Sequence, residues 1–310
     1  MWQFLLCVAA SALLACGLYM ARLKQISGAR PAGAIVSALI ALVLGFAGAK
    51  LFYVLLQLDF AHITDLNPER FSVFGGAVGV CAAVALCAGL CSVRPMDALN
   101  AFAPGGALVL CGVRLGEYFL GPDYLQHGMI GLSDSLELIF DGNYWHVCLP
   151  EAGVALAAAL LAWWIYDRRL CFLRTVWFLC ALQLLTELFH NQSLIVSFVR
   201  EEQVACAVVM AVILFVHCRH GLSTDDHRRF TPFLWFFAPV VIIAYLEFEL
   251  DKAWIDNFLY DNVFSRISYE LADAITGVRD LICFGFVLAC IVWACVLQVK
   301  AIRRRADMLR

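Results

Sequence analysis

The feature that most constrains this fold is a series of apolar runs, each close to the length that crosses a bilayer. A transmembrane helix needs about 20 consecutive apolar residues. We therefore predict an all-α polytopic membrane protein with about nine transmembrane helices, an expectation that the 63% hydrophobic and 15% charged content supports. The runs, four of them short, lie at 2–19, 32–56, 73–91, 98–113, 149–165, 176–189, 204–216, 233–245 and 281–299.

The basic residues predict how these helices are oriented. Cytoplasmic loops retain Lys and Arg, and Arg22, Lys24 and Arg30 follow the first run, which no basic residue precedes. With the amino terminus outside, most of the 22 basic residues fall on the cytoplasmic side. We therefore predict the amino terminus outside and the carboxy terminus inside. The first run is then a retained span and not a cleaved signal peptide.

Composition excludes several other classes of function. A net charge of −3, with no basic cluster beside exposed aromatic residues, argues against nucleic acid as a partner. Almost all of the 14 cysteines stand singly inside predicted spans, which favours packing residues over a disulfide framework. No CxxC or HExxH spacing occurs, so no metal site and no cofactor are predicted.

The stretch 101–121 carries the first functional hypothesis. It has no charge before Arg114, and Glu117 follows three residues later. On a helix these two side chains share a face and can pair. A guanidinium at the end of an apolar span is costly unless it is paired or reaches a wet cavity, so Arg114 marks a possible functional site. The alternative is that Arg114 extends to the interface and anchors the span.

Further polar residues interrupt the other spans. Lys50 lies in the middle of the second run with Tyr53 one turn later, and either faces an interior site or extends outward. Gly75 and Gly76 open the third run, where they permit a close backbone approach. Glu151 adds a carboxylate near the outer boundary of the fifth run.

The sixth run ends in a polar stripe. Gln183, Glu187 and His190 share one helix face, as interhelical contacts or as a cavity lining. We favour a lining, because an ionised carboxylate is costly inside a bilayer. Gln203 opens the next run, and His146 lies in an outer segment. A cavity with several cations at the outer headgroup level suits an anionic phospholipid.

A series of motifs carries a resemblance to a known family. Read in order, LGFAGAKLFYVL, RFSVFGGAVG, NAFAP, GVRLGEYFLG, WHVCLPEAG and LLTELFHNQS resemble prolipoprotein diacylglyceryl transferase over roughly 32–216. The resemblance implies seven spans around a phosphatidylglycerol cavity in the bacterial cytoplasmic membrane. It also implies transfer of the diacylglyceryl group to the cysteine thiol of a preprolipoprotein signal peptide, with release of glycerol phosphate.

The resemblance matches some site residues and alters others in the first half of the chain. Arg114 falls on the essential arginine of the family's GRxGNFxNxE signature, and Gly121 matches one of its glycines. Glu117 stands where the family has asparagine, and Phe74 replaces the histidine of an FHGG motif. Lys50 replaces an arginine.

Further along, Gln183 stands in place of a second essential arginine, whereas Glu187 matches the family's glutamate and His190 stands at a later arginine. His146 and Glu151 resemble an HPxQLYE motif that lacks its tyrosine here. The resemblance thus implies that Arg114 stabilises phosphate charge, that His146 or His190 carries a proton, and that Glu117 and Glu187 orient basic groups. Together, the sequence pattern and the resemblance predict these substrate-binding residues: Lys50, Tyr53, Gly75, Gly76, Glu117, Gly121, Glu151, Gln183 and Gln203.

The predicted domain organisation is a seven-helix core over 1–218 and an extension over 219–310 with two spans and an outer amphipathic loop. The loop covers the cavity, receives a partner, or simply connects two helices. Because the site is altered, a catalytically silent lipid-binding or assembly protein on the same scaffold is the alternative function. A transporter is disfavoured, since no inverted repeat relates the two halves.

Overall fold

The chain forms two compact units, one of residues 1–129 with 146–179 and the other of residues 130–145 with 180–310. The computed structural model describes residues 2–57, 60, 63–64, 70–120, 129–130, 145–146, 148–165, 170–186, 195–196 and 199–221. Beyond 221 it describes 266, 271, 285, 288–289, 291–293, 295–296 and 299–300. The predicted outer loop of the extension and the eighth predicted span, 233–245, therefore lie outside the described residues.

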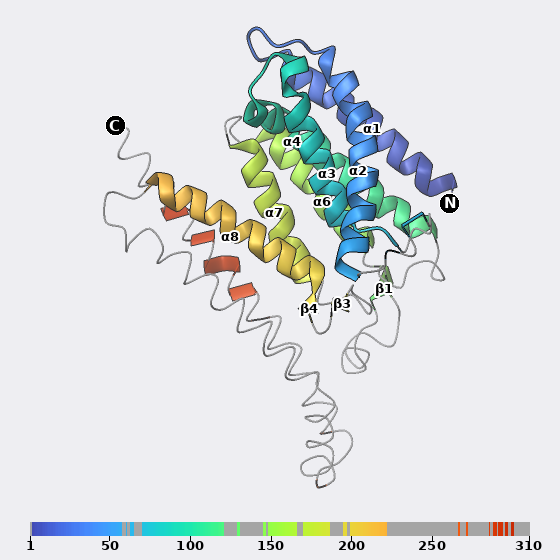
Figure 1. Ribbon diagram of the computed structural model, residues 1–310. Helices are drawn as coiled ribbons and strands as arrows, with labels where there is room; N and C mark the ends of the chain where they lie inside the picture. Colours follow the sequence, from blue (N-terminus) through green and yellow to red (C-terminus); the bar gives the residue numbers. More distant parts are fainter. Residues whose placement is uncertain are drawn as a thin grey trace. The chain divides into compact units, whose positions relative to one another are not determined.

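The described part is almost entirely helical, which confirms the all-α prediction there (Figure 1). The first unit contains α1 (Trp2–Leu23), α2 (Gly33–Gln57), α3 (Val73–Leu86), the 3-10 turn η3 (Cys87–Cys91), α4 (Pro95–Glu117), η4 (Tyr118–Leu120), α6 (Cys148–Trp164) and the first part of α7 (Cys171–Thr186). The second unit contains the end of α7, an antiparallel pair β3 (Ile195–Val196) and β4 (Val199–Arg200), and α8 (Glu201–Gly221). Two further short strands, β1 (Met129–Ile130) and β2 (Trp145–His146), pair with each other.

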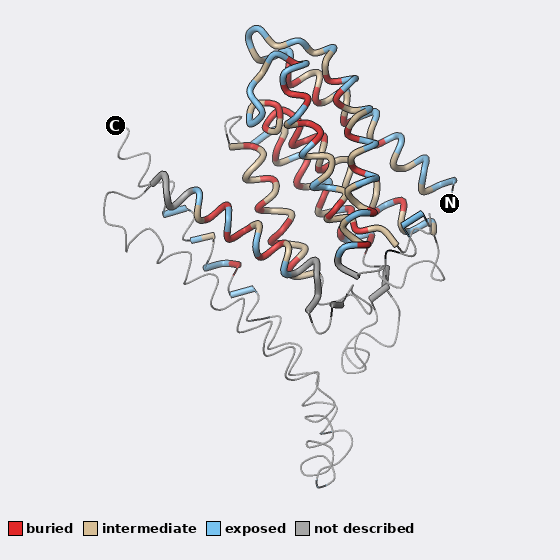
Figure 2. Tube along the Cα trace, in the orientation of Figure 1, coloured by how far each residue is buried: buried red, intermediate tan, exposed pale blue. Residues whose placement is uncertain are grey.

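Helix α4 is the centre of the first unit. In its most apolar stretch 56% of the residues are buried, against 17% to 28% in α1, α2 and α3 with η3. Figure 2 shows the same contrast, with buried positions along α4 and exposed positions along much of α1. Helices α1 and α6 both pack against α4, so α4 has neighbours on two sides.

Small residues bring α1 and α4 close together in antiparallel order. A Cβ on Gly116 would lie 2.8 Å from the Phe4 ring, and a Cβ on Gly105 would lie 2.8 Å from the backbone oxygen of Ala15. Contacts near the start of α1 are therefore made by the end of α4. Such small residues let helix backbones approach in lipid, where packing rather than water exclusion drives association.

The pair α2 and α3 is built in the same way. A Cβ on Gly48 would lie 2.6 Å from the backbone oxygen of Gly75, and one on Gly79 would collide with the backbone oxygen of Leu44. Gly75 itself packs against Phe52. The glycines at the start of α3 thus have a packing reason that is independent of any ligand.

We predict that Gly79→Ala destabilises the protein by about 1 to 3 kcal/mol, because the added methyl would collide with the backbone of Leu44 and force the two helices apart. Gly153→Ala is the matched control, since nothing lies within 4 Å of a Cβ at that helical position. Alanine has the better helix propensity by about 1 kcal/mol, so the control should be neutral or stabilising. Thermal unfolding in detergent measures both, and equal behaviour of the two variants would contradict the close α2–α3 contact.

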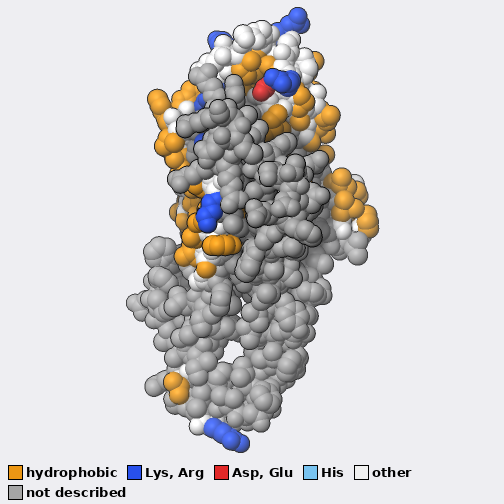
Figure 3. All heavy atoms as spheres, turned by 90° about the vertical axis from the view of Figure 1, so that its left-hand side faces the viewer, with side chains coloured by type: hydrophobic (Ala, Val, Ile, Leu, Met, Phe, Trp, Pro, Cys, Tyr) orange, Lys and Arg blue, Asp and Glu red, His pale blue; other side chains and the backbone are white. Residues whose placement is uncertain are grey.

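The surface of the described helices is suited to lipid. Four are long and apolar enough to cross a membrane: Trp2–Leu23, Gly33–Leu55, Val73–Cys91 and Pro95–Leu120. The next three predicted spans correspond to shorter apolar helices over Cys148–Trp164, Cys171–Thr186 and Val204–Val216. Large apolar side chains such as Leu13 and Leu86 are more than three quarters exposed. Figure 3 shows mostly hydrophobic side chains among the described surface residues on the face it draws. The count of nine and the orientation stay predictions.

Two buried polar side chains hold the connection between α6 and α7. Arg22, at the end of α1, donates from Nη2 to the backbone oxygens of Ala162 and Trp163, both at 2.7 Å, and its guanidinium lies 4.7 Å from the Trp163 ring centroid. Asn100 of α4 accepts from the backbone N–H of Phe172 at 2.9 Å. The Arg22 guanidinium therefore supplies hydrogen bonds to backbone carbonyls at the end of α6. The side-chain oxygen of Asn100 accepts from a backbone N–H at the start of α7.

Candidate functional site

Three charged side chains meet where α4 ends and α6 begins. The Arg114 guanidinium donates from Nη1 to both carboxylate oxygens of Glu117, at 3.4 and 3.1 Å. Its Nε lies 3.0 Å from Oε2 of Glu151. The pairing of Arg114 with Glu117 confirms the prediction from their spacing.

The position of each charged side chain in its helix is electrostatically favourable. Arg114 lies in the last turn of α4, where the helix dipole favours a cation, and Glu151 lies in the first turn of α6, where it favours an anion. Because α4 packs against α6, the two favourable ends come together. Glu117 is the last residue of α4 and reaches the guanidinium from one turn away.

The cluster is buried. The side chains of Arg114, Glu117 and Glu151 are 8%, 12% and 5% exposed. Arg114 therefore does not extend to solvent as an anchor, and that alternative interpretation is wrong. Cys148, at the start of α6, is 1% exposed and interacts electrostatically with all three charged groups.

Lys50 is a second buried cation, in a different environment. Its ammonium donates to the backbone oxygen of Arg70 at 3.4 Å and lies 5.0 Å from the Phe71 ring centroid and 5.7 Å from that of Tyr53. The side chain is turned toward the segment that leads into α3, so it does not extend outward. Nearby, the Ser72 hydroxyl accepts from the backbone N–H of Gly75 at 3.2 Å and caps α3.

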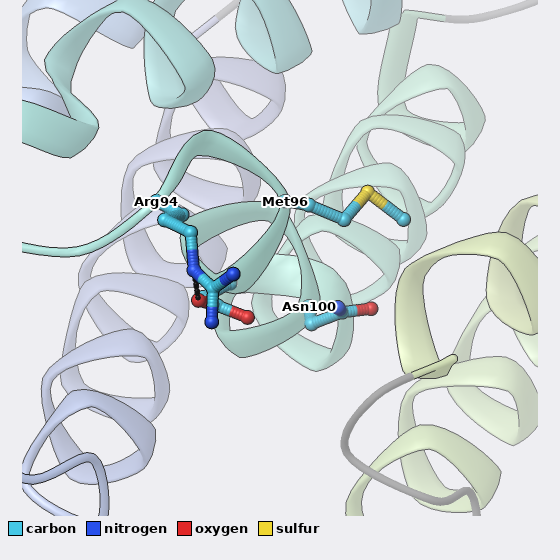
Figure 4. Close-up of a pocket in the computed structure, with 4 residues that line it drawn as sticks. Arg94, Met96 and Asn100 are labelled. Carbon is cyan, nitrogen blue, oxygen red and sulfur yellow. Dashed lines mark ion pairs between the residues drawn. The ribbon is translucent and has the colours of Figure 1, made fainter.

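A third polar group lies at the opposite end of α4. Arg94, Met96, Asp97 and Asn100 line an open pocket of about 530 Å³ (Figure 4). Arg94 pairs with Asp97 at 3.3 Å, but these side chains are 90% and 43% exposed. Exposed pairs of this kind are screened by water and contribute little. The pocket is thus a solvated helix start, and the buried Arg114 cluster is the stronger site.

The comparison with protein families connects this geometry to a known enzyme class. The profile described as prolipoprotein diacylglyceryl transferase matches residues 2–219, more than two thirds of the chain. The chain belongs to the prolipoprotein diacylglyceryl transferase family. No curated protein and no solved structure matches it. The family is one of membrane-bound transferases, which agrees with the membrane-spanning helices described above.

The structure places only part of the site that family resemblance predicts. It brings together Arg114, Glu117 and Glu151, and separately Lys50 with Tyr53, whereas Gly75 and Gly76 lie in the α2–α3 contact. Gln183 is half-buried on the part of α7 that belongs to the second unit. Gly121, Glu187 and His190, and the side chains of His146 and Gln203, lie outside what the structure describes.

Sequence reasoning missed that Glu151 is a partner of Arg114. The two residues are far apart in sequence, so no periodicity relates them. The signal available was a carboxylate in the first turn of an otherwise apolar helix, which requires a cation nearby in a bilayer. Arg22 was likewise interpreted only as a basic residue of a cytoplasmic loop, although it is 7% exposed and holds the end of α6.

Proposed function

We propose that this chain transfers the diacylglyceryl group of a membrane phospholipid onto the cysteine thiol of a lipoprotein precursor, in a bacterial cytoplasmic membrane. The family match over residues 2–219 supports the reaction class. The observation that carries the proposal is the buried guanidinium of Arg114, fixed by two carboxylates at the end of a helix long enough to span a bilayer. Phosphatidylglycerol is the donor that family resemblance implies.

The reaction requires stabilisation of a phosphate leaving group. The thiol sulfur attacks the glyceryl carbon that bears the phosphate, a carbon–sulfur bond forms, and the carbon–oxygen bond to phosphate breaks. The thiol proton is lost to a base and the phosphate leaves with the headgroup attached. A guanidinium suits this step because its planar N–H donors match phosphate oxygens. A donor fixed in advance in a water-poor site stabilises developing charge without reorganisation.

Glu117 and Glu151 are positioning residues in this proposal. They contact Arg114 through different nitrogens, Nη1 and Nε, so the plane of the guanidinium is defined from two sides. His146 or His190 is the proposed proton carrier, as the resemblance implies. Lys50 and Tyr53 are the proposed second contact to the donor lipid.

A turnover assay tests the proposal. The purified protein, in vesicles that contain both phosphatidylglycerol and phosphatidylethanolamine, is incubated with a lipobox peptide and the peptide mass is measured. We expect a mass gain of one diacylglyceryl group and an equimolar release of headgroup phosphate. A peptide with serine in place of the lipobox cysteine is the control and should gain nothing. A peptide of unchanged mass would contradict the transferase proposal.

The second candidate is a catalytically silent lipid-binding protein on the same scaffold. One observation favours it: Arg114 already contacts two carboxylates, so a phosphate must compete with both for the guanidinium. Native mass spectrometry distinguishes the two proposals, because a silent protein retains phospholipid although no headgroup phosphate is released.

A further inference from the structure

Lys50 is a charged side chain in the apolar part of a helix long enough to span a bilayer. It lies within the span Gly33–Leu55 and is 6% exposed. A buried ammonium in such a position is costly, and a lysine there marks a functional site whose partner is an anion. Whether the protein itself supplies that anion is decided by the contacts of the ammonium.

The described contacts of the Lys50 ammonium are all with uncharged groups. Its Nζ donates to the backbone oxygen of Arg70 at 3.4 Å, which is longer than the common range of about 2.7 to 3.2 Å. The Phe71 and Tyr53 ring centroids lie 5.0 and 5.7 Å away, toward the limit of about 6 Å for cation–π contacts. An ammonium has three N–H donors, and within the part of the chain that the structure describes only one meets an acceptor. The surroundings of Lys50 therefore attract an anion.

The groups around Lys50 are held in place by the contact between α2 and α3. The backbone N–H of Ser72 donates to the backbone oxygen of Ala49 at 3.0 Å, and the Phe71 ring centroid lies 4.9 Å from that of Phe46. The segment that leads into α3 is thus fixed against α2 next to the ammonium. A cation whose surroundings are already ordered loses little conformational freedom when a ligand binds, which favours binding.

Arg114 is in a different electrostatic environment. Its guanidinium contacts the carboxylates of Glu117 and Glu151 at 3.1 and 3.0 Å. An incoming phosphate diester must compete with both carboxylates there, whereas at Lys50 it competes with a long hydrogen bond to a carbonyl. When the carbon–oxygen bond breaks, the diester becomes a monoester with more negative charge, and its attraction to Arg114 increases. Arg114 is therefore better suited to the transition state than to the incoming lipid.

Lys50 and Arg114 lie toward the same membrane face. The start of α2 lies beside η3, because the backbone N–H of Arg30 donates to the backbone oxygen of Cys91 at 2.8 Å. Helix α4 follows η3 in the chain, so both helices start at this end of the first unit. Lys50 and Arg114 both lie toward the far ends of these helices. Lipids of one leaflet can therefore reach both residues.

We propose that Lys50 captures the phosphate of an anionic phospholipid from the outer leaflet, and that Arg114 acts on this lipid only in the transfer step. The proposal rests on the proposed function and specifies how the site selects its lipid. Lys50 is then a specificity-determining residue that sets the KM for lipid, whereas Arg114 sets kcat. The bond changes of the transfer step are those given above.

Lipid retention and kinetics of Lys50→Met test the proposal. The full-length protein is reconstituted in phosphatidylcholine vesicles with equimolar phosphatidylglycerol and diacylglycerol, and retained lipid is identified by native mass spectrometry. The rate of lipobox-peptide lipidation is measured against phosphatidylglycerol content. We expect Lys50→Met to lower phosphatidylglycerol retention about tenfold and to raise KM by the same factor at unchanged kcat, since a hydrogen bond to a charged group contributes at least that much. Retention of diacylglycerol, which has no phosphate, should not change.

Two variants and one competitor are the controls. Lys50→Arg keeps the charge and should retain phosphatidylglycerol as the wild type does. Lys24→Met makes the same substitution at an exposed lysine that follows α1, and should leave retention and kinetics unchanged. Excess inorganic phosphate should not displace the lipid, because a buried site among aromatic rings favours a phosphate that carries acyl chains. Displacement by inorganic phosphate would overturn the lipid as the ligand of Lys50.

The unfolding temperature in lipid-free detergent separates binding from structure. If Lys50 serves to bind lipid, Lys50→Met removes a costly buried charge and should leave this temperature unchanged or raise it. A lower unfolding temperature with unchanged lipid retention would assign Lys50 a structural role and overturn the proposal. A wild type that retains diacylglycerol as strongly as phosphatidylglycerol would overturn it without any variant.

Failure of this proposal is distinguishable from failure of the proposed function. A fall in kcat at unchanged KM in Lys50→Met would contradict capture by Lys50 while the transferase stands. Loss of phosphatidylglycerol retention in Lys50→Met, without turnover by the wild type, would support capture by Lys50 and contradict the transferase.

Discussion

Replacing Arg114 with lysine is expected to lower the rate of lipid transfer at least a hundredfold while the protein stays folded. A lysine keeps the positive charge, but its ammonium is a point donor and cannot contact Glu117 and Glu151 from the two edges of a rigid plane. Loss of one fixed donor to a developing anion typically costs about 2.7 to 4 kcal/mol of transition-state stabilisation, which is a factor of 10² to 10³ in rate. The rate of peptide lipidation measures the effect.

The alanine variant alone does not separate catalysis from folding. Arg114→Ala leaves two buried carboxylates without their counter-charge, and breaking a buried ion pair in this way costs about 3 to 5 kcal/mol. The informative control is the triple variant Arg114→Met, Glu117→Gln and Glu151→Gln, which removes all three charges together. Neutral replacement of a whole buried cluster is often neutral or stabilising. We therefore expect the triple variant to unfold near the wild-type temperature and to transfer no lipid.

The outcome that contradicts the site is retained turnover. If Arg114→Lys, or the folded triple variant, lipidates the peptide at more than a tenth of the wild-type rate, the guanidinium does not act on the reacting phosphate. The cluster would then be a structural contact between α4 and α6, and the site would have to be found elsewhere in the chain.

Sequence reasoning succeeded where a feature depends on neighbours along the chain. The helical class follows from the length of the apolar runs, and the pair of Arg114 with Glu117 follows from one helical turn. Both are local properties. The family resemblance also rests on local motifs, read in order along the chain, and the profile match over residues 2–219 confirms it.

What the sequence could not provide is which helices touch. Glu151 joins Arg114 only because α6 packs against α4. Lys50 turns toward Phe71 only because α2 and α3 meet through glycines that leave no space for a Cβ. In each case the partner is set by helix packing, which depends on side-chain shape over two surfaces, so neither segment alone identifies the residue that it meets.

Arg22 gives the second large prediction. We expect Arg22→Met to lower the free energy of unfolding by about 2 to 4 kcal/mol, because it removes hydrogen bonds from a buried cation to the backbone oxygens of Ala162 and Trp163. It also removes the contact with the Trp163 ring, worth about 0.5 to 2 kcal/mol. Those oxygens belong to the last turn of α6, where helix carbonyls lack the usual partners within the helix. The Ala162 oxygen also accepts from Cys171 Sγ at 3.4 Å, so the Trp163 oxygen is the more affected of the two. Thermal unfolding of the full chain in detergent measures the effect.

Arg94→Met is the matched control for Arg22→Met. The positive-inside rule counts both arginines alike, because each follows an apolar run on the side predicted to be cytoplasmic. Burial separates them: the Arg94 side chain is 90% exposed and pairs with a half-exposed Asp97, whereas Arg22 is 7% exposed. Removing Arg94 should therefore change the unfolding temperature very little. If the two variants were destabilised equally, the charge itself would matter at both positions, and the contact between Arg22 and the end of α6 would not explain the loss. A large effect at Arg22 alone would instead establish that α1 and α6 are held together by this guanidinium.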